Sequence, residues 1–235
     1  MVMYSMIYET QVPDGTPWIY WHSYNLIPNI VSIIVYIVIG LLLFRRKEGE
    51  VDIYHKVKIG YGVFSIFYAM CRVFFILAIW IGDYYQILTE IGYLWTTLGL
   101  EVILIVIENN LVKGTRHFFT VVGAIFTVIL IAGILNLYEQ ELARDLTGYV
   151  SPVLIALIVI LYLYIAIKGA KDIRKNALLV ILAVAFIAVG ALLDGEKMVI
   201  NARTWFLDDL MLELFYSIPP VFLITGILVF YKVLK

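Results

Sequence analysis

The stretch Tyr85–Asn110, YQILTEIGYLWTTLGLEVILIVIENN, decides the fold of this chain. It is long and apolar enough to cross a bilayer as a single helix. Its polar residues Glu90, Thr97, Glu101 and Glu108 follow one another at spacings of seven, four and seven. At about 100° per residue, these four lie within roughly 20° of one line along the helix. Because carboxylates cannot face lipid cheaply, this face must meet protein or water.

The composition of the whole chain also indicates a membrane protein. Of its 235 residues, 63% are hydrophobic and 15% are charged, whereas a soluble domain averages about 45–50% apolar and about 25% charged residues. The apolar residues occur in long runs, which is the pattern of polytopic helical membrane proteins. We predict an all-α integral membrane protein, a seven-transmembrane-helix bundle over residues 25–235, preceded by an extracytoplasmic N-terminal segment, residues 1–24.

The seven spans and their orientation follow from hydropathy and charge. The apolar segments are expected at residues 25–44, 57–81, 85–110, 118–137, 148–167, 177–193 and 210–234. Most basic residues flank alternate ends of these segments: Arg45, Arg46, Lys47, Lys56, Lys58, Lys113, Arg116, Lys168, Lys171, Arg174, Lys175, Lys232 and Lys235. By the positive-inside rule, the N-terminus is outside and the C-terminus is cytoplasmic. The expected location is the plasma membrane.

Polar residues at helical spacing also mark one face of three other segments. The first carries Asn25, Asn29, Ser32 and Tyr36; the second Tyr61, Ser65, Tyr68 and Arg72; the seventh Asp209, Glu213, Tyr216 and Pro220. Each set lies on one side of its helix. We therefore expect the first, second, third and seventh helices to share a polar interior.

The depths of the charged residues predict an ion pair in this interior. At about 1.5 Å per residue, Arg72 and Glu101 lie at similar levels of antiparallel helices. An unpaired charge in mid-bilayer costs roughly 2.5–3.5 kcal/mol on insertion scales. We predict that Arg72 pairs with Glu101 and that Tyr68 adds a hydrogen bond. Glu108, next to Asn109, is expected to be solvated at the interface.

Intramembrane ionisable residues mark functional sites by default, although a buried pair can also serve only helix register. The candidate ligand- or proton-binding residues are Arg72, Glu101, Glu90, Glu213, Tyr68, Tyr216, Thr97 and Asn29.

Several classes of function are disfavoured. Retinal is not expected, because the lysines of the last helix, Lys232 and Lys235, lie at its end rather than in mid-membrane. The three histidines form no metal-binding motif, and none pairs with a serine for nucleophilic catalysis. We predict no cofactor, no metal site and no nucleic-acid partner, and an enzyme is not expected.

Three functions remain open. The first is a receptor-like or sensor-like module that binds a small or protonatable ligand and signals through the basic cytoplasmic loops to a protein partner. The second is a small proton-coupled transporter, in which the acids of the third helix relay protons. The third is a membrane scaffold or assembly subunit whose polar stripes only hold helices together.

Overall fold

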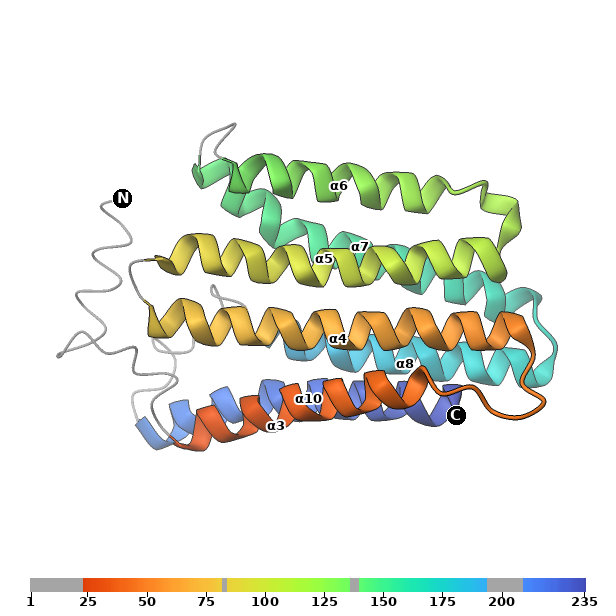
Figure 1. Ribbon diagram of the computed structural model, residues 1–235, viewed down its shortest axis with the longest axis horizontal. Coiled ribbons are helices and arrows are strands. Elements are labelled where there is room, and N and C mark those ends of the chain that lie inside the picture. Colours follow the sequence, from red (N-terminus) through yellow and green to blue (C-terminus); the bar gives the residue numbers. More distant parts are fainter. Residues whose placement is uncertain (1–22, 82–83, 136–139, 194–208) are drawn as a thin grey trace.

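The computed structural model describes residues 23–81, 84–135, 140–193 and 209–235, which contain helices and no strand. The α-helices are α3 (Ser23–Leu43), α4 (Asp52–Trp80), α5 (Tyr85–Asn110), α6 (Phe118–Ile134), α7 (Gln140–Lys168), α8 (Lys171–Leu193) and α10 (Asp209–Leu234), with a short 3₁₀ helix η2 (Lys113–Thr115) before α6. They lie side by side along the long axis of the molecule (Figure 1). The predicted all-helical fold is confirmed, while most of the predicted N-terminal segment lies outside the described residues.

Several helices begin before the apolar segments that predicted them. The bounds of α5 agree with the prediction, but α7 starts at Gln140 rather than residue 148, and α8 starts at Lys171 rather than residue 177. Hydropathy marks only the part of a helix that suits lipid, whereas backbone hydrogen bonds continue through flanking residues of good helix propensity. The segments therefore located the helices correctly but underestimated the lengths of α7 and α8, whereas α6 ends at Ile134, before the predicted residue 137.

Six of the described helices are long and apolar enough to cross a membrane, and the 17-residue α6 is a shorter apolar helix. At about 1.5 Å per residue, α6 measures roughly 26 Å, slightly less than the roughly 30 Å hydrocarbon core. The architecture indicates a multi-pass membrane protein. The count of seven spans and their orientation remain predictions.

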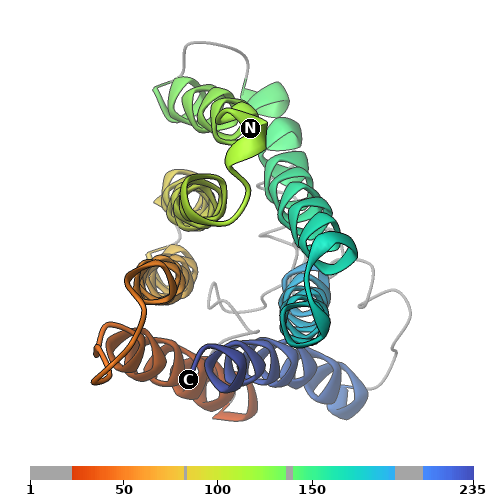
Figure 2. The same ribbon diagram turned by 90° about the vertical axis from the view of Figure 1, so that its right-hand side faces the viewer.

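The helices form a ring in chain order. Viewed along the helices, α3, α4, α5, α6, α7 and α8 follow one another, and α10 closes the ring beside α3 (Figure 2). Helix α5 also contacts α7. Near the ring closure, the Phe230 ring of α10 lies 4.7 Å from the Tyr61 ring of α4. The last helix thus packs beside the first two, as the polar stripes predicted.

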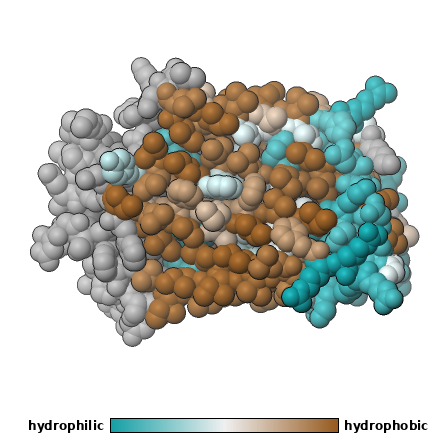
Figure 3. All heavy atoms as spheres, in the orientation of Figure 1, coloured by the Kyte–Doolittle hydropathy of each residue, from teal (hydrophilic) through white to brown (hydrophobic). Residues whose placement is uncertain are grey.

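The outer surface between the two ends of the bundle is largely apolar, and α3 shows how polar residues are kept inside. On α3, the exposed residues are Ile27, Val31, Ile34, Val38 and Leu41, whereas the buried ones include Asn29, Ser32 and Tyr36. The two sets alternate with helical spacing, so they occupy opposite sides of α3. Figure 3 shows the resulting apolar surface, with hydrophilic residues gathered at one end.

We call this hydrophilic end the basic end; it comprises residues 44–58, residues 111–117, residues 168–175 and the last turn of α10. Glu50 organises its first connection. The Lys58 ammonium donates to Glu50 Oε1 at 2.8 Å, and the Lys47 amide donates to Glu50 Oε2 at 3.1 Å. The Tyr54 hydroxyl donates to the Val233 carbonyl of α10 at 2.8 Å. These contacts tie the α3–α4 connection to the end of α10.

Candidate functional site

Arg72 is among the largest fully buried side chains of the described residues and lies among polar groups of α3 and α4. Its Nη2 donates to the Asn29 side-chain oxygen, and Ser32 Oγ donates to the Asn29 carbonyl at 2.7 Å. The Tyr36 and Tyr68 rings lie 4.9 Å apart, and the Tyr36 hydroxyl donates to the Leu223 carbonyl of α10 at 3.1 Å. We call Asn29, Ser32, Tyr36, Tyr68 and Arg72 the arginine cluster; it joins α3, α4 and α10.

The predicted ion pair between Arg72 and Glu101 is wrong. Both residues are described, and they form no salt bridge within 4.0 Å. Glu101 instead turns toward α6, where its carboxylate packs on Gly123. A methyl group added to Gly123 would overlap with Glu101 Oε2 and would lie 2.9 Å from Glu101 Cδ. The prediction that Tyr68 adds a hydrogen bond to this ion pair is therefore also wrong. Tyr68 belongs to the arginine cluster.

The packing of α4 against α5 explains the error. The glycines of α5 mark its α4 face, because a methyl group on Gly92 would lie 2.5 Å from Phe75, and one on Gly99 would lie 3.1 Å from Phe64. Glu101 follows Gly99 by two positions, which places it roughly 160° away around the helix. The acids therefore look away from α4. A similar depth on two helices does not determine which way each side chain points.

Glu108 is buried rather than solvated, because it caps the first turn of α6. Its carboxylate accepts hydrogen bonds from the Phe119 amide at 3.2 Å, the Thr120 amide at 2.7 Å and the Thr120 hydroxyl at 2.6 Å. The two residues before α6, Arg116 and His117, have left-handed backbones with φ of 48° and 64°. A carboxylate at a helix N-terminus satisfies free amides and interacts well with the helix dipole.

Of the remaining candidate residues, two lie on the face of α5 that carries Glu101, and the side chains of two others lie outside the described residues. Thr97 is buried on the same face of α5 as Glu101, and Glu90 is half-buried on that face. Glu213 and Tyr216 belong to α10, but their side chains lie outside the described residues. The structure thus replaces one predicted pocket by two polar groupings, the arginine cluster and the acid face, which consists of Glu90, Thr97, Glu101 and Glu108.

The acid face contains two buried oxygens without a hydrogen-bond partner among the described residues. Glu101 is 8% exposed and its Oε2 has no donor, and Thr97 Oγ1 one turn away is also unsatisfied. Such atoms are rare in native proteins and each needs an explanation, such as a bound water, ion or proton. Within the described ranges, no group of three or more His, Cys, Asp or Glu side chains could hold a metal ion.

Gly123 is the partner that the sequence reasoning missed. It lies on one side of the fourth apolar segment with Thr120 and Thr127, at spacings of three and four. A small residue in an apolar helix is a signal for close approach of a neighbour. Read together with the acids of α5, this signal could have placed the acid face against α6.

Comparison with protein-family models, curated proteins and solved structures found no match to this chain. The site must therefore be interpreted from its own geometry, within a helical bundle of membrane-protein character.

Proposed function

We propose that this protein is a receptor-like or sensor-like membrane module in which Glu101 binds a proton or a small cationic ligand between α5 and α6. One observation carries the proposal: the Glu101 carboxyl is buried in an apolar helix interface, packs on Gly123, and leaves Oε2 without a hydrogen bond among the described residues. Such a carboxylate has far more to gain from a proton or a cation than one that is already satisfied.

The surroundings of Glu101 contain little that could compensate its charge. The nearby acid on its own helix is Glu108, which caps α6. On α6, the Thr127 hydroxyl donates to the Gly123 carbonyl at 3.2 Å. On α7, which also contacts α5, residues 149–167 carry no charge. Occupancy of the carboxyl by a proton or a cation would therefore change the energy of the α5–α6 contact directly.

The same interface offers a route to an output. Both acids contact α6: Glu101 packs on Gly123 in mid-helix, and Glu108 caps the first turn of α6 next to the basic end. If α6 shifts when Glu101 changes its charge, the Glu108 cap transmits the shift to η2 and the loop beside it. A switch of this kind needs contacts that differ between two states, and the charge on Glu101 supplies that difference. A cytoplasmic protein partner at the basic end would detect the change.

Proton-coupled transport is the second candidate, because the acid face extends along α5 from Glu90 to Glu108. A relay along this face would need Glu108 to accept and release protons. Its carboxylate is instead engaged by three hydrogen bonds from α6. This engagement favours the sensor over the transporter. In the third candidate, a scaffold, neither protonation nor ligand binding at Glu101 would change the protein.

Infrared difference spectra of the full-length protein in liposomes test the proposal. We expect pH-dependent changes in one carboxyl band and in the backbone amide bands, and both should be absent in Glu101→Gln. Glu48→Gln, which alters an exposed acid at the basic end, is the control. Gly123→Ala should shift the titration midpoint, because the added methyl group displaces the carboxyl.

Amide changes that persist in Glu101→Gln would reject Glu101 as the input of a sensor. A pH-sensitive dye trapped in the same liposomes separates sensing from transport. Acidification that requires Glu101 would favour the transporter, and a protein indifferent to Glu101→Gln in both assays would favour the scaffold.

A further inference from the structure

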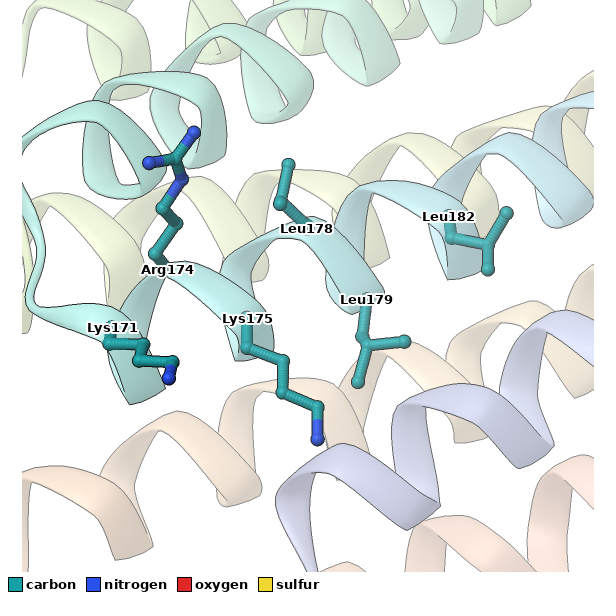
Figure 4. Close-up of a pocket in the computed structure, with 6 residues that line it drawn as sticks. All are labelled: Lys171, Arg174, Lys175, Leu178, Leu179 and Leu182. Atoms are coloured by element: carbon teal, nitrogen blue, oxygen red, sulfur yellow. The ribbon is translucent and has the colours of Figure 1, made fainter.

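Helix α8 begins at the basic end with a surface hollow of about 390 Å³. Its lining residues are Lys171, Arg174, Lys175, Leu178, Leu179 and Leu182. Figure 4 shows that all six project from α8, with the three basic residues in its first turns and the leucines following along the helix. The hollow is thus cationic at one end and apolar at the other.

The charges of the basic residues in the hollow are not neutralised by other described residues. None of Lys171, Arg174 and Lys175 forms an ion pair with another described residue. All three are exposed, as is Asp172, the acid in the first turn. Their position also opposes the helix dipole, which favours anions at an N-terminus and cations at a C-terminus. Three cations at this position raise the local affinity for a negatively charged group instead.

The leucines of the hollow restrict which negatively charged molecule can bind there. Leu178 and Leu182 remain 47% and 46% exposed. From Lys171 to Leu182 the hollow follows α8 for roughly 16 Å, close to the depth of one hydrocarbon leaflet, about 15 Å. A soluble acidic protein could reach the basic residues but not leucines that lie at membrane depth. A phospholipid extends from a phosphate to an acyl chain over this distance.

We propose that the hollow on α8 binds an anionic phospholipid, with its phosphate at Lys171, Arg174 and Lys175 and an acyl chain along Leu178 and Leu182. Clusters of basic residues at the cytoplasmic end of a transmembrane helix attract anionic headgroups. The site is separate from the acid face, because it uses the exposed side of α8 and no residue of α5 or α6. It would be occupied whether or not Glu101 has the role proposed above.

Titration of the full-length protein in neutral detergent with short-chain phosphatidylglycerol, followed by native mass spectrometry, tests this site. The variant Lys171→Gln/Arg174→Gln/Lys175→Gln should bind the lipid about 100-fold more weakly than the parent chain. The control Arg45→Gln/Lys56→Gln/Lys232→Gln removes the same charge from exposed positions at the basic end and should change affinity less than about three-fold. Circular dichroism verifies that both variants remain helical.

A second comparison tests the apolar half of the hollow. Leu178→Gln/Leu182→Gln should weaken phosphatidylglycerol binding and leave the weak binding of glycerol phosphate unchanged. Equal losses in the two triple variants would overturn the proposal, as would equal affinity for phosphatidylglycerol and phosphatidylcholine. Binding of an acidic peptide at the same three residues, without a preference for phosphatidylglycerol, would identify a protein partner and reject the lipid.

Discussion

At the scale of single residues, the buried charges differ in how the chain satisfies them. Arg72 donates to Asn29, and Glu108 accepts three hydrogen bonds from α6. Glu101 packs on a glycine and leaves one carboxyl oxygen without a donor among the described residues. Burial alone therefore does not identify a functional residue. The proposed function rests on the contrast between satisfied and unsatisfied carboxylates on one face of α5.

The hydrogen bond between Arg72 and Asn29 predicts energetic coupling between these two residues. In a double-mutant cycle of Asn29→Leu and Arg72→Leu, we expect a coupling of about 1.5–3 kcal/mol in the free energy of unfolding, the range for hydrogen bonds to charged groups. The cycle of Arg72→Leu and Glu101→Leu should couple by less than about 0.5 kcal/mol, because those side chains do not meet. Unfolding in mixed micelles measures both. Strong coupling to Glu101 would restore the rejected ion pair.

At the scale of elements, carboxylates at the basic end hold helix termini and connections in place. Glu108 caps α6 from α5, and Glu50 gathers the α3–α4 connection around Lys58. Lys58 is buried and paired with Glu50. Each carboxylate connects two elements that hydropathy predicts as separate segments. Removing the carboxylate should therefore lower the stability of the elements that it connects.

Loss of the α6 cap should destabilise the protein. Glu108→Gln keeps the size of the side chain but removes its charge and one of its two acceptor oxygens. We expect a loss of about 1–3 kcal/mol in the free energy of unfolding, because the amide group that replaces one carboxylate oxygen cannot accept a hydrogen bond from the first turn of α6. Thermal melts in detergent measure the effect, and Glu48→Gln serves as the exposed control. Equal melting temperatures for the two variants would show that the cap is dispensable.

The Glu50 connection should respond to acid. The hydrogen bond from Lys58 lowers the pKa of the Glu50 carboxyl below its ordinary value, which is about 4.3 in an unfolded chain. A depressed pKa in the folded state contributes stability above the unfolded pKa and loses it as the pH falls through the folded pKa. We expect the melting temperature to fall below about pH 4.5 more steeply in the parent chain than in Glu50→Gln. Parallel pH profiles would contradict this role.

At the scale of the whole molecule, the ring of helices places the arginine cluster and the acid face in two different parts of the bundle. The arginine cluster lies where α10 closes the ring against α3 and α4, and the acid face lies between α5 and α6. A sensor needs a contact that can change without unfolding the rest. The shortest apolar helix, α6, packs over Glu101, while the arginine cluster holds α3, α4 and α10 together.

The orientation of the ring in the membrane predicts a labelling pattern. The described cysteine, Cys71, is buried, so introduced cysteines report without background. Lys171→Cys, at the basic end, should react with an impermeant maleimide only after cells are permeabilised. Tyr84→Cys, an exposed position between α4 and α5 at the opposite end, should react in intact cells. The reverse pattern would invert the proposed topology.

Predictions that depend on neighbouring residues were more successful than predictions of contacts between helices. The bounds of α5 and the sharing of one face by Glu90, Thr97, Glu101 and Glu108 depend only on helical geometry, and the structure confirms the bounds. The partner of Glu101 depends on how α5 is rotated against its neighbours. Gly92 and Gly99 pack against α4 and thereby fix the rotation of α5. The hydropathy of the segment does not indicate this rotation.

By itself, the sequence determined that this chain is a bundle of apolar helices and that one helix carries its acids in a line, because apolar length and helical periodicity are properties of neighbouring residues. Only the tertiary structure decided that Glu101 faces Gly123 of α6 and that Arg72 binds Asn29 of α3. The physical reason is that helices pack most closely where their smallest residues meet. The rotation of each helix, and so the partner of each charged side chain, therefore depends on residues that are distant in the sequence.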